Sequence, residues 1–137
     1  MAVLIGRVAS GRGDLGQWMT LYADAYEHVV GIRLYPGSLN VVLDHEFVLP
    51  EDRLRIEPKD YGGRVGMNIV TCRIGGLPAF IVRTDQNEAG VGHHGREVVE
   101  VAAPVRLRDA LGLVDGDTIE VVIEGSDADP RSSSDGE

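Results

Sequence analysis

A hydroxyl and an amide stand two positions apart after a tight-turn sequence in residues 35–44 (YPGSLNVVLD). Pro36 and Gly37 favour a turn, and the apolar residues that follow alternate with Ser38 and Asn40, which predicts a half-buried strand. Ser38 and Asn40 would then lie side by side on one face. Their oxygens are hard donors, of the kind that Mg²⁺ prefers beside substrate phosphates. The alternative is a polar pair on the solvent face, and the spacing alone leaves both interpretations open.

Residues 11–16 read G-R-G-D-L-G after an apolar run, which matches the pattern G-x-G-x-x-G. Glycines leave backbone N–H groups accessible, so such a loop can approach phosphate groups closely. A dinucleotide-binding domain also needs a βαβ unit and an acidic residue about 20 positions further on, and neither is evident. Because the chain has 18 glycines, the pattern also arises by chance, so a plain flexible loop is the alternative.

Two arginines and one glutamate near the end of the chain could also do chemistry. Arg106 and Arg108, in the segment A-P-V-R-L-R-D, could neutralise phosphate. On a helix, side chains two positions apart diverge, which would leave one of the two solvated. A helix that began only after Leu107 would instead place both in the segment before it. Glu100 interrupts the apolar residues 98–101 on an expected strand, so it faces either solvent or a ligand cavity.

Residues 84–96 are polar and rich in glycine, and we expect a long mobile loop there. His93 and His94 near its end could bind a metal or transfer a proton. The carboxylates nearby in the sequence are Glu88 and Glu97, so a solvent-exposed pair of histidines is the alternative.

The elements that must position these residues are mostly short strands. Apolar alternation and turn residues predict strands at residues 2–9, 38–44, 54–56, 65–74, 77–82, 98–102 and 118–124. Apolar residues spaced three and four apart from Trp18 to Val30 predict one amphipathic helix, with Gly31 as its C-terminal cap. A second helix is expected to include residues 107–111, with Pro104 in its first turn. Six or seven short strands and two helices favour a mainly β fold, a β-barrel with helical insertions, over a parallel α/β sheet.

The chain has 137 residues and a net charge of −9. We expect one barrel domain over residues 1–124 and a disordered acidic tail over residues 125–137. The acidic balance argues against nonspecific binding to nucleic acid or anionic membranes. Cys72 is the single cysteine, which predicts a buried structural thiol. Neither a signal-peptide pattern nor an apolar run of about 18 residues is evident, so a cytoplasmic protein is expected.

Three motifs occur in order along residues 3–124: S-G-x-G, then Y-P-G-S-L-N, then V-E-V-A-A-P-V-R-L-R-D followed by D-G-D. In this combination the chain resembles the archaeal-type CTP-dependent riboflavin kinases, which are small cradle-loop β-barrels. The resemblance implies transfer of the CTP γ-phosphate to the riboflavin 5′-hydroxyl, with FMN and CDP as products. It also implies riboflavin and CTP as small-molecule partners and Mg²⁺ as the metal. The oligomeric state stays open, and a monomer is assumed.

The resemblance further implies roles for particular residues. The nucleotide-binding residues would be Gly11, Arg12, Gly13, Asp14, Leu15, Gly16 and Gln17 in the first segment and Val105, Arg106, Leu107 and Arg108 in the last. The family's magnesium ligands, a Thr and an Asn in P-G-T-L-N, correspond to Ser38 and Asn40. Glu100 matches the glutamate that contacts the flavin, and it could orient or deprotonate the accepting hydroxyl. Arg108 would offset phosphate charge.

The chain departs from the family pattern in three respects. The nucleotide loop is one residue longer, because Asp14 and Leu15 stand where the family has one residue. The family's flavin-contacting Thr aligns near Gly92, so this contact is missing or supplied by another residue, and the loop over residues 85–95 is hard to align.

Two other functions therefore compete with the kinase. One is a flavin- or nucleotide-binding module without transfer activity. The other is a DNA-binding regulator, since residues 107–121 also look like the swapped-hairpin transcription factors of the AbrB kind. The acidic balance of the chain weighs against the regulator.

Overall fold

The computed structural model describes residues 2–10, 15–91 and 95–123, with only the backbone of Leu15. Its strands are β1 (Ala2–Ala9), β2 (Leu39–Leu43), β3 (Leu54–Ile56), β4 (Met67–Ile74), β5 (Leu77–Thr84), β6 (Val98–Ala102) and β7 (Thr118–Ile123). Its helices are α1 (Leu15–Leu21), α2 (Ala23–Val30), α3 (Pro58–Tyr61), α4 (Asp85–Glu88) and α5 (Leu107–Leu111). The number of strands agrees with the prediction, but the expectation of two helices is wrong. Within the described residues, no helix is both long and apolar enough to cross a membrane.

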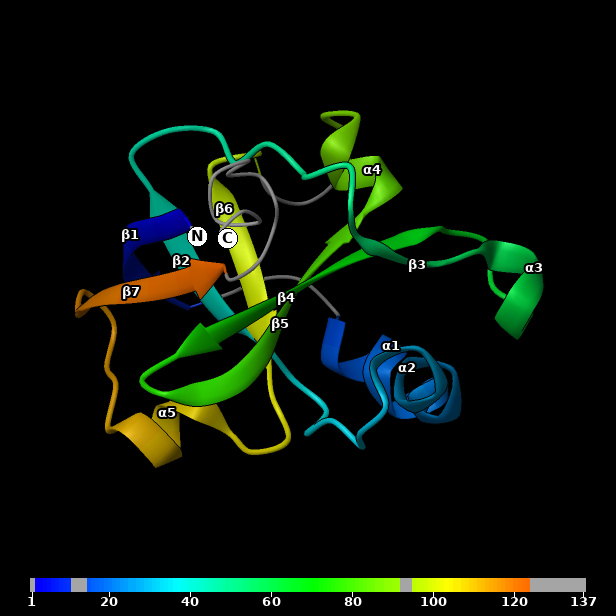
Figure 1. Cartoon of the computed structure of the whole chain (residues 1–137), viewed down its shortest axis with the longest axis horizontal. Helices are drawn as coiled ribbons and strands as arrows, with labels where there is room; N and C mark the ends of the chain where they lie inside the picture. Colours follow the sequence, from blue (N-terminus) through cyan, green and yellow to red (C-terminus); the bar gives the residue numbers. More distant parts are fainter. Residues whose placement is uncertain (1, 11–14, 92–94, 124–137) are drawn as a thin grey trace, which may run out of the picture.

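The strands form a closed barrel. They pair in the order β3-β4-β5-β6-β2-β1-β7, and β7 pairs back with β4. Every pairing is antiparallel. Six strands, from β4 round to β7, close the ring, and β3 pairs with β4 outside it (Figure 1). Closure pairs β7 with β4, so the ring itself has no open edge, and β3 is the edge strand that remains. The predicted mainly β, barrel-type fold is confirmed.

Alternating side chains fill the interior of the barrel. On β2, the side chains of Leu39, Val41 and Leu43 point inward and are almost fully buried, as their spacing predicted. The other strands contribute Leu4, Val8, Val70, Cys72, Ile74, Ala79, Ile81, Val99, Val101, Val121 and Ile123 to the same cluster. Burial of these apolar side chains is the main favourable contribution to the stability of the barrel.

A second apolar layer covers part of the outside of the barrel. Met67, Ile69, Phe80, Val82 and Ala102 on β4, β5 and β6 pack with Met19 of α1 and Tyr26 of α2. Glu100 shares this outer face, because it alternates with the inward-facing Val99 and Val101. The strand register pairs Glu100 with Val82 on one side and with Asn40 on the other. Glu100 therefore lies at the border between the layer covered by helices and the polar residues of β2.

The single helix expected from Trp18 to Val30 is wrong, because α1 and α2 are separated at Tyr22. Tyr22 has φ −116° and ψ 34°, outside the helical range. Its ring stacks on Trp18 and packs edge-on against Tyr61, with ring centroids 5.6 and 4.5 Å apart. Contacts with a distant segment such as α3 leave no trace in the local spacing. Gly31 ends α2 with φ 86°, as predicted.

Two further elements differ from the sequence-based expectations. The long loop expected over residues 84–96 begins instead with α4, where Thr84 Oγ1 accepts a hydrogen bond from Asn87 N at 3.0 Å. The helix α3 was not predicted, although Pro58 at its start is a known signal. Pro104 does not lie in a first helical turn, because α5 begins only at Leu107.

Candidate functional site

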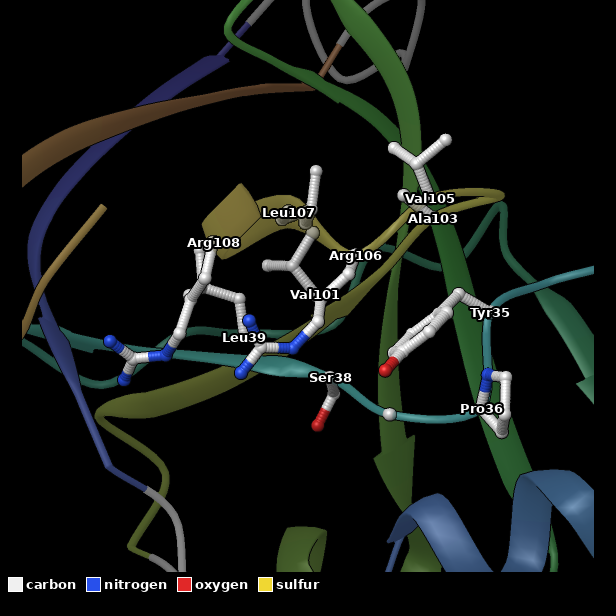
Figure 2. Close-up of a pocket in the computed structure, with 11 residues that line it drawn as sticks. Tyr35, Pro36, Ser38, Leu39, Val101, Ala103, Val105, Arg106, Leu107 and Arg108 are labelled. Atoms are coloured by element: carbon white, nitrogen blue, oxygen red, sulfur yellow. The ribbon is translucent and has the colours of Figure 1, made fainter. Parts of the chain in front are cut away.

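A pocket of about 270 Å³ lies at one end of the barrel, between the turn before β2 and the connection from β6 to α5. Its lining consists of Tyr35, Pro36, Gly37, Ser38, Leu39, Val101, Ala103, Val105, Arg106, Leu107 and Arg108. Figure 2 shows Tyr35, Pro36 and Ser38 along one side and residues 105–108 along the other. A backbone hydrogen bond joins the two sides, because Tyr35 N donates to Ala103 O at 2.8 Å. The pocket thus combines two motifs that are far apart in the sequence.

Both arginines of the last motif reach this pocket. Arg106 is the N-cap residue of α5, and Arg108 lies in its first turn. Arg106 Nη1 pairs with Asp109 Oδ1 at 2.7 Å, and Arg108 Nη2 pairs with Asp115 Oδ1 at 2.5 Å. The expected divergence on a helix does not occur, because Arg106 precedes the first helical residue. The pocket therefore holds two guanidinium groups, each paired with one carboxylate.

Ser38, Asn40 and Glu100 meet on the outer face of the barrel. Asn40 and Glu100 are partners in the register of β2 and β6, and Ser38 Oγ donates to Glu100 Oε1 at 2.9 Å. Asn40 is 6% exposed, and its Oδ1 has no hydrogen-bond partner among the described residues. A buried amide oxygen without a partner costs free energy, so this atom is suited to receive a donor or a cation. The side chains predicted to share a face do so, and the fold adds a carboxylate beside them.

Ser38 and Asn40 are also the residues that could hold a metal here. A hydroxyl that donates its hydrogen to a carboxylate keeps its lone pairs for another partner. Together with the unpaired Asn40 oxygen, this gives two hard oxygen donors. Within residues 2–10, 15–91 and 95–123, no group of three or more His, Cys, Asp or Glu side chains could hold a metal ion. His93, His94 and Gly92 lie outside these ranges, so their expected roles stay predictions.

The glycine-rich segment is described only at its two ends. Its members Gly11, Arg12, Gly13 and Asp14 lie outside the described residues, whereas Leu15, Gly16 and Gln17 begin α1. At the first end, Ser10 Oγ donates to Asp115 Oδ2 at 2.6 Å, and Asp115 also holds Arg108. At the second end, a Cβ atom on Gly16 would lie 3.5 Å from the carbonyl oxygen of Pro36. The segment thus starts beside one wall of the pocket and ends beside the other.

Three residues near the site were not singled out from the sequence. Tyr35 and Asp115 appeared only as members of the ordered motifs Y-P-G-S-L-N and D-G-D, with no role of their own. Tyr26 was assigned only to the apolar side of a helix, but its buried hydroxyl has no hydrogen-bond partner among the described residues. Burial raises the pKa of Tyr26 above its usual value, and electrostatic interactions with Tyr61 and Glu100 add to this. Nothing in the helical spacing separates such a tyrosine from an ordinary core residue.

Comparisons with known proteins identify the family of the chain. The family model CTP-dep_RFKase, described as "Domain of unknown function DUF120", matches residues 8–123. The chain belongs to the CTP-dependent riboflavin kinase family. This confirms the resemblance inferred from the three ordered motifs.

Curated relatives of this family member carry the name riboflavin kinase. The protein from Pyrobaculum arsenaticum is 34% identical over 133 residues, which cover 88% of this chain and 60% of the relative. The protein from Methanocorpusculum labreanum is 36% identical, with 88% and 57% covered. The protein from Staphylothermus marinus is 28% identical, with 88% and 90% covered. The chain thus spans about 60% of the length of several riboflavin kinase relatives.

Proposed function

We propose that this protein transfers the γ-phosphoryl group of CTP to the 5′-hydroxyl of riboflavin, giving FMN and CDP. Membership of the CTP-dependent riboflavin kinase family and the names of the relatives support this proposal. Riboflavin and CTP would be its partners. A cytoplasmic location, a monomeric state and the absence of nucleic-acid binding stay predictions.

The position of Ser38 is the observation that carries the proposal. Ser38 lines the pocket that contains Arg106 and Arg108, and its hydroxyl also donates to Glu100. Phosphoryl transfer requires a cationic site for the donor phosphates and a polar site for the accepting hydroxyl, placed side by side. In this fold the two sites share one residue.

The residues present also fit a magnesium ion. Ser38 Oγ and Asn40 Oδ1 would hold it, since both are oxygen donors and the second has no partner among the described residues. When bound, Mg²⁺ neutralises phosphate charge and helps to orient the donor.

The remaining roles follow from charge and position. Arg106 and Arg108 bind phosphate oxygens, with Val105 and Leu107 completing the wall of the nucleotide pocket. Residues 11–17 complete the nucleotide site. Glu100 orients the accepting hydroxyl or takes its proton. Gly92 has no side chain, so it cannot supply the contact that the family's Thr makes with the flavin. Little covalent chemistry is asked of these residues, because phosphoryl transfer depends mainly on positioning and charge neutralisation.

The first prediction concerns turnover and donor choice. Purified protein, incubated with riboflavin, Mg²⁺ and either CTP or ATP, is expected to form FMN with CTP and far less with ATP. Chromatography with flavin fluorescence measures the product. The double variant Ser38→Ala/Glu100→Gln serves as the negative control, because it removes both the hydroxyl and the charge at which the two sites meet. Absence of FMN with either donor would contradict the kinase and leave the binding module as the function to test.

A further inference from the structure

Asp115 connects Ser10, the residue before the glycine-rich segment, with Arg108 of the pocket. Its Oδ2 accepts a hydrogen bond from Ser10 Oγ at 2.6 Å, and its Oδ1 accepts one from Arg108 Nη2 at 2.5 Å. Ser10 directly precedes the glycine-rich residues 11–16, and Arg108 lines the pocket. One carboxylate therefore binds Ser10 through one oxygen and Arg108 through the other.

The turn that carries Asp115 is itself fixed against β1. Gly116 N donates to Val8 O at 2.7 Å, and Val8 N donates to Asp117 O at 2.8 Å. Within the turn, Asp117 Oδ2 accepts a hydrogen bond from Val114 N at 2.9 Å. Gly116 adopts φ 94°, a conformation that other residues rarely adopt. The backbone of the barrel therefore sets the position of the carboxylate.

Asp115 also determines which part of the Arg108 guanidinium is open to a ligand. Nη2 of Arg108 donates both to Asp115 Oδ1 and to Ala9 O, the latter at 3.3 Å. Nε and Nη1 make no hydrogen bond with the described residues, so their N–H groups can still be donated to an anion. Figure 2 shows this guanidinium at the end of the pocket farther from Tyr35 and Pro36. An arginine that is oriented before binding loses less conformational freedom when a phosphate arrives.

We propose that Asp115 is a positioning residue of the nucleotide site, because it orients Arg108 toward the phosphates and anchors Ser10, the residue that precedes the glycine-rich segment. The inference rests on the proposed function, and it gives Asp115 the role of linking Ser10 to Arg108. Hydrogen bonds from Ser10 and Arg108 hold the pKa of the Asp115 carboxyl below its usual value of 3.8, so it is ionised at neutral pH.

Asp109 offers a matched control for Asp115. It pairs with Arg106, the other arginine of the pocket, at 2.7 Å, and its side chain is 73% exposed. It lies only three residues from Arg106 and has no hydrogen bond to Ser10. Loss of either carboxylate removes one negative charge beside one arginine of the pocket. A difference between the two variants therefore reports the link to Ser10 and Arg108 and does not report charge alone.

The test titrates CTP and riboflavin separately into the full chain by calorimetry, and follows thermal unfolding of each variant. Asp115→Asn is expected to weaken CTP binding about tenfold and to leave riboflavin affinity and Tm close to those of the unchanged protein. Ser10→Ala is expected to weaken CTP binding about threefold. Asp109→Asn is expected to change CTP affinity less than about twofold.

A double-mutant cycle separates positioning from a local effect. In an Arg108→Ala background, Asp115→Asn should weaken CTP binding by less than about twofold further, because Asp115 acts largely through Arg108. The inference would be overturned if Arg108→Ala weakened CTP binding while Asp115→Asn alone left CTP binding unchanged or made it tighter. The proposed function is read independently, from FMN formation by the unchanged protein. A protein that binds CTP without forming FMN refutes the kinase and still allows this cycle, whereas failure to bind CTP refutes both.

Discussion

Asn40 shows at the level of one residue how this fold prepares a site. Its amide oxygen is buried and has no hydrogen-bond partner within the described part of the chain. Such an atom costs about 1–3 kcal/mol relative to a satisfied one. Ser38 and Glu100 lie on the same outer face, so the unpaired oxygen of Asn40 lies next to two other oxygen-bearing side chains. Function can explain why a polar side chain is kept at a position where an apolar one would be more stable.

Replacement of Asn40 by alanine should separate function from stability. Asn40→Ala is expected to lower Mg²⁺-dependent turnover by about 100-fold or more, because it removes a proposed metal ligand. Its Tm should shift by less than about 4 °C, because the lost oxygen makes no hydrogen bond that stabilises the fold. The FMN assay and a thermal melt measure the two effects.

Asn40→Asp is the matched variant, since it keeps an oxygen at the same place and should retain Mg²⁺-supported turnover. Asn40→Ala should also regain part of its activity at higher Mg²⁺ concentrations if metal affinity is what it has lost. Turnover of Asn40→Ala that equals that of the unchanged protein would refute the ligand assignment.

At the level of elements, a polar cluster joins β3, β4 and α4. Asp85 Oδ1 accepts hydrogen bonds from Arg55 Nη1 at 2.9 Å and from Asn68 Nδ2 at 2.8 Å. Asn68 is almost fully buried, and its Oδ1 accepts from Arg53 and Arg55. Asp85 N also donates to Gly66 O at 3.0 Å. This cluster fixes the start of the connection between β5 and β6, the strand that carries Glu100.

Asp85 should make the stability of these elements depend on pH. The hydrogen bond from Arg55, aided by that from Asn68, holds the pKa of Asp85 below its ordinary value of 3.8. A carboxyl whose pKa is lower in the folded state stabilises the fold above its unfolded pKa. This contribution is lost as the pH falls below 3.8 and through the lowered folded pKa. Asp85→Asn is therefore expected to reduce the fall in stability on acidification, measured by urea unfolding at several pH values.

Asp24→Asn provides the control, because it removes an exposed ion pair of 2.9 Å between Asp24 of α2 and Arg33, which follows that helix. At neutral pH, Asp85→Asn should cost about 0.5–1 kcal/mol, a modest amount because the Asp85 side chain is 48% exposed. A pH profile of Asp85→Asn that is parallel to that of the unchanged protein would show that the pair does not contribute.

At the level of the whole molecule, closure of the barrel isolates its interior from solvent. Ile69, Ile74 and Ile81 are among the largest fully buried side chains, and they come from both faces of β4 and β5. The inner cluster and the outer layer under α1 and α2 therefore share the same strands. Such an arrangement is expected to unfold as one cooperative unit.

Cys72 can report that cooperativity. It is 2% exposed inside the barrel, and burial raises the pKa of its thiol to about 12. A thiol reagent at about pH 8 should therefore not modify the folded protein within hours, because the thiol is protonated at that pH and is buried away from solvent. In about 6 M guanidinium chloride the thiol should react fully. Absorbance of the released chromophore measures the reaction, and Cys72→Ser supplies the blank. Rapid modification of the folded protein would show that the barrel opens locally.

The strands and the ordered motifs could be predicted from the amino-acid sequence alone, whereas the short helices α3 and α4 could not. Period-two alternation placed Leu39, Val41 and Leu43 inside and Ser38 and Asn40 on the opposite face, because side chains on a strand must alternate. The ordered motifs also indicated the family. Apolar alternation and turn chemistry are properties of near neighbours in the chain, so a single sequence carries their signal.

Only the tertiary structure decided which distant residues meet. Ser38 and Glu100 are 62 positions apart, and their hydrogen bond follows from the pairing of β2 with β6. The break at Tyr22 likewise accompanies a contact with Tyr61. Asp115 reaches Ser10 across 105 positions because β7 pairs with β1. Strand order and register depend on the packing energy of the whole barrel, which no local pattern contains.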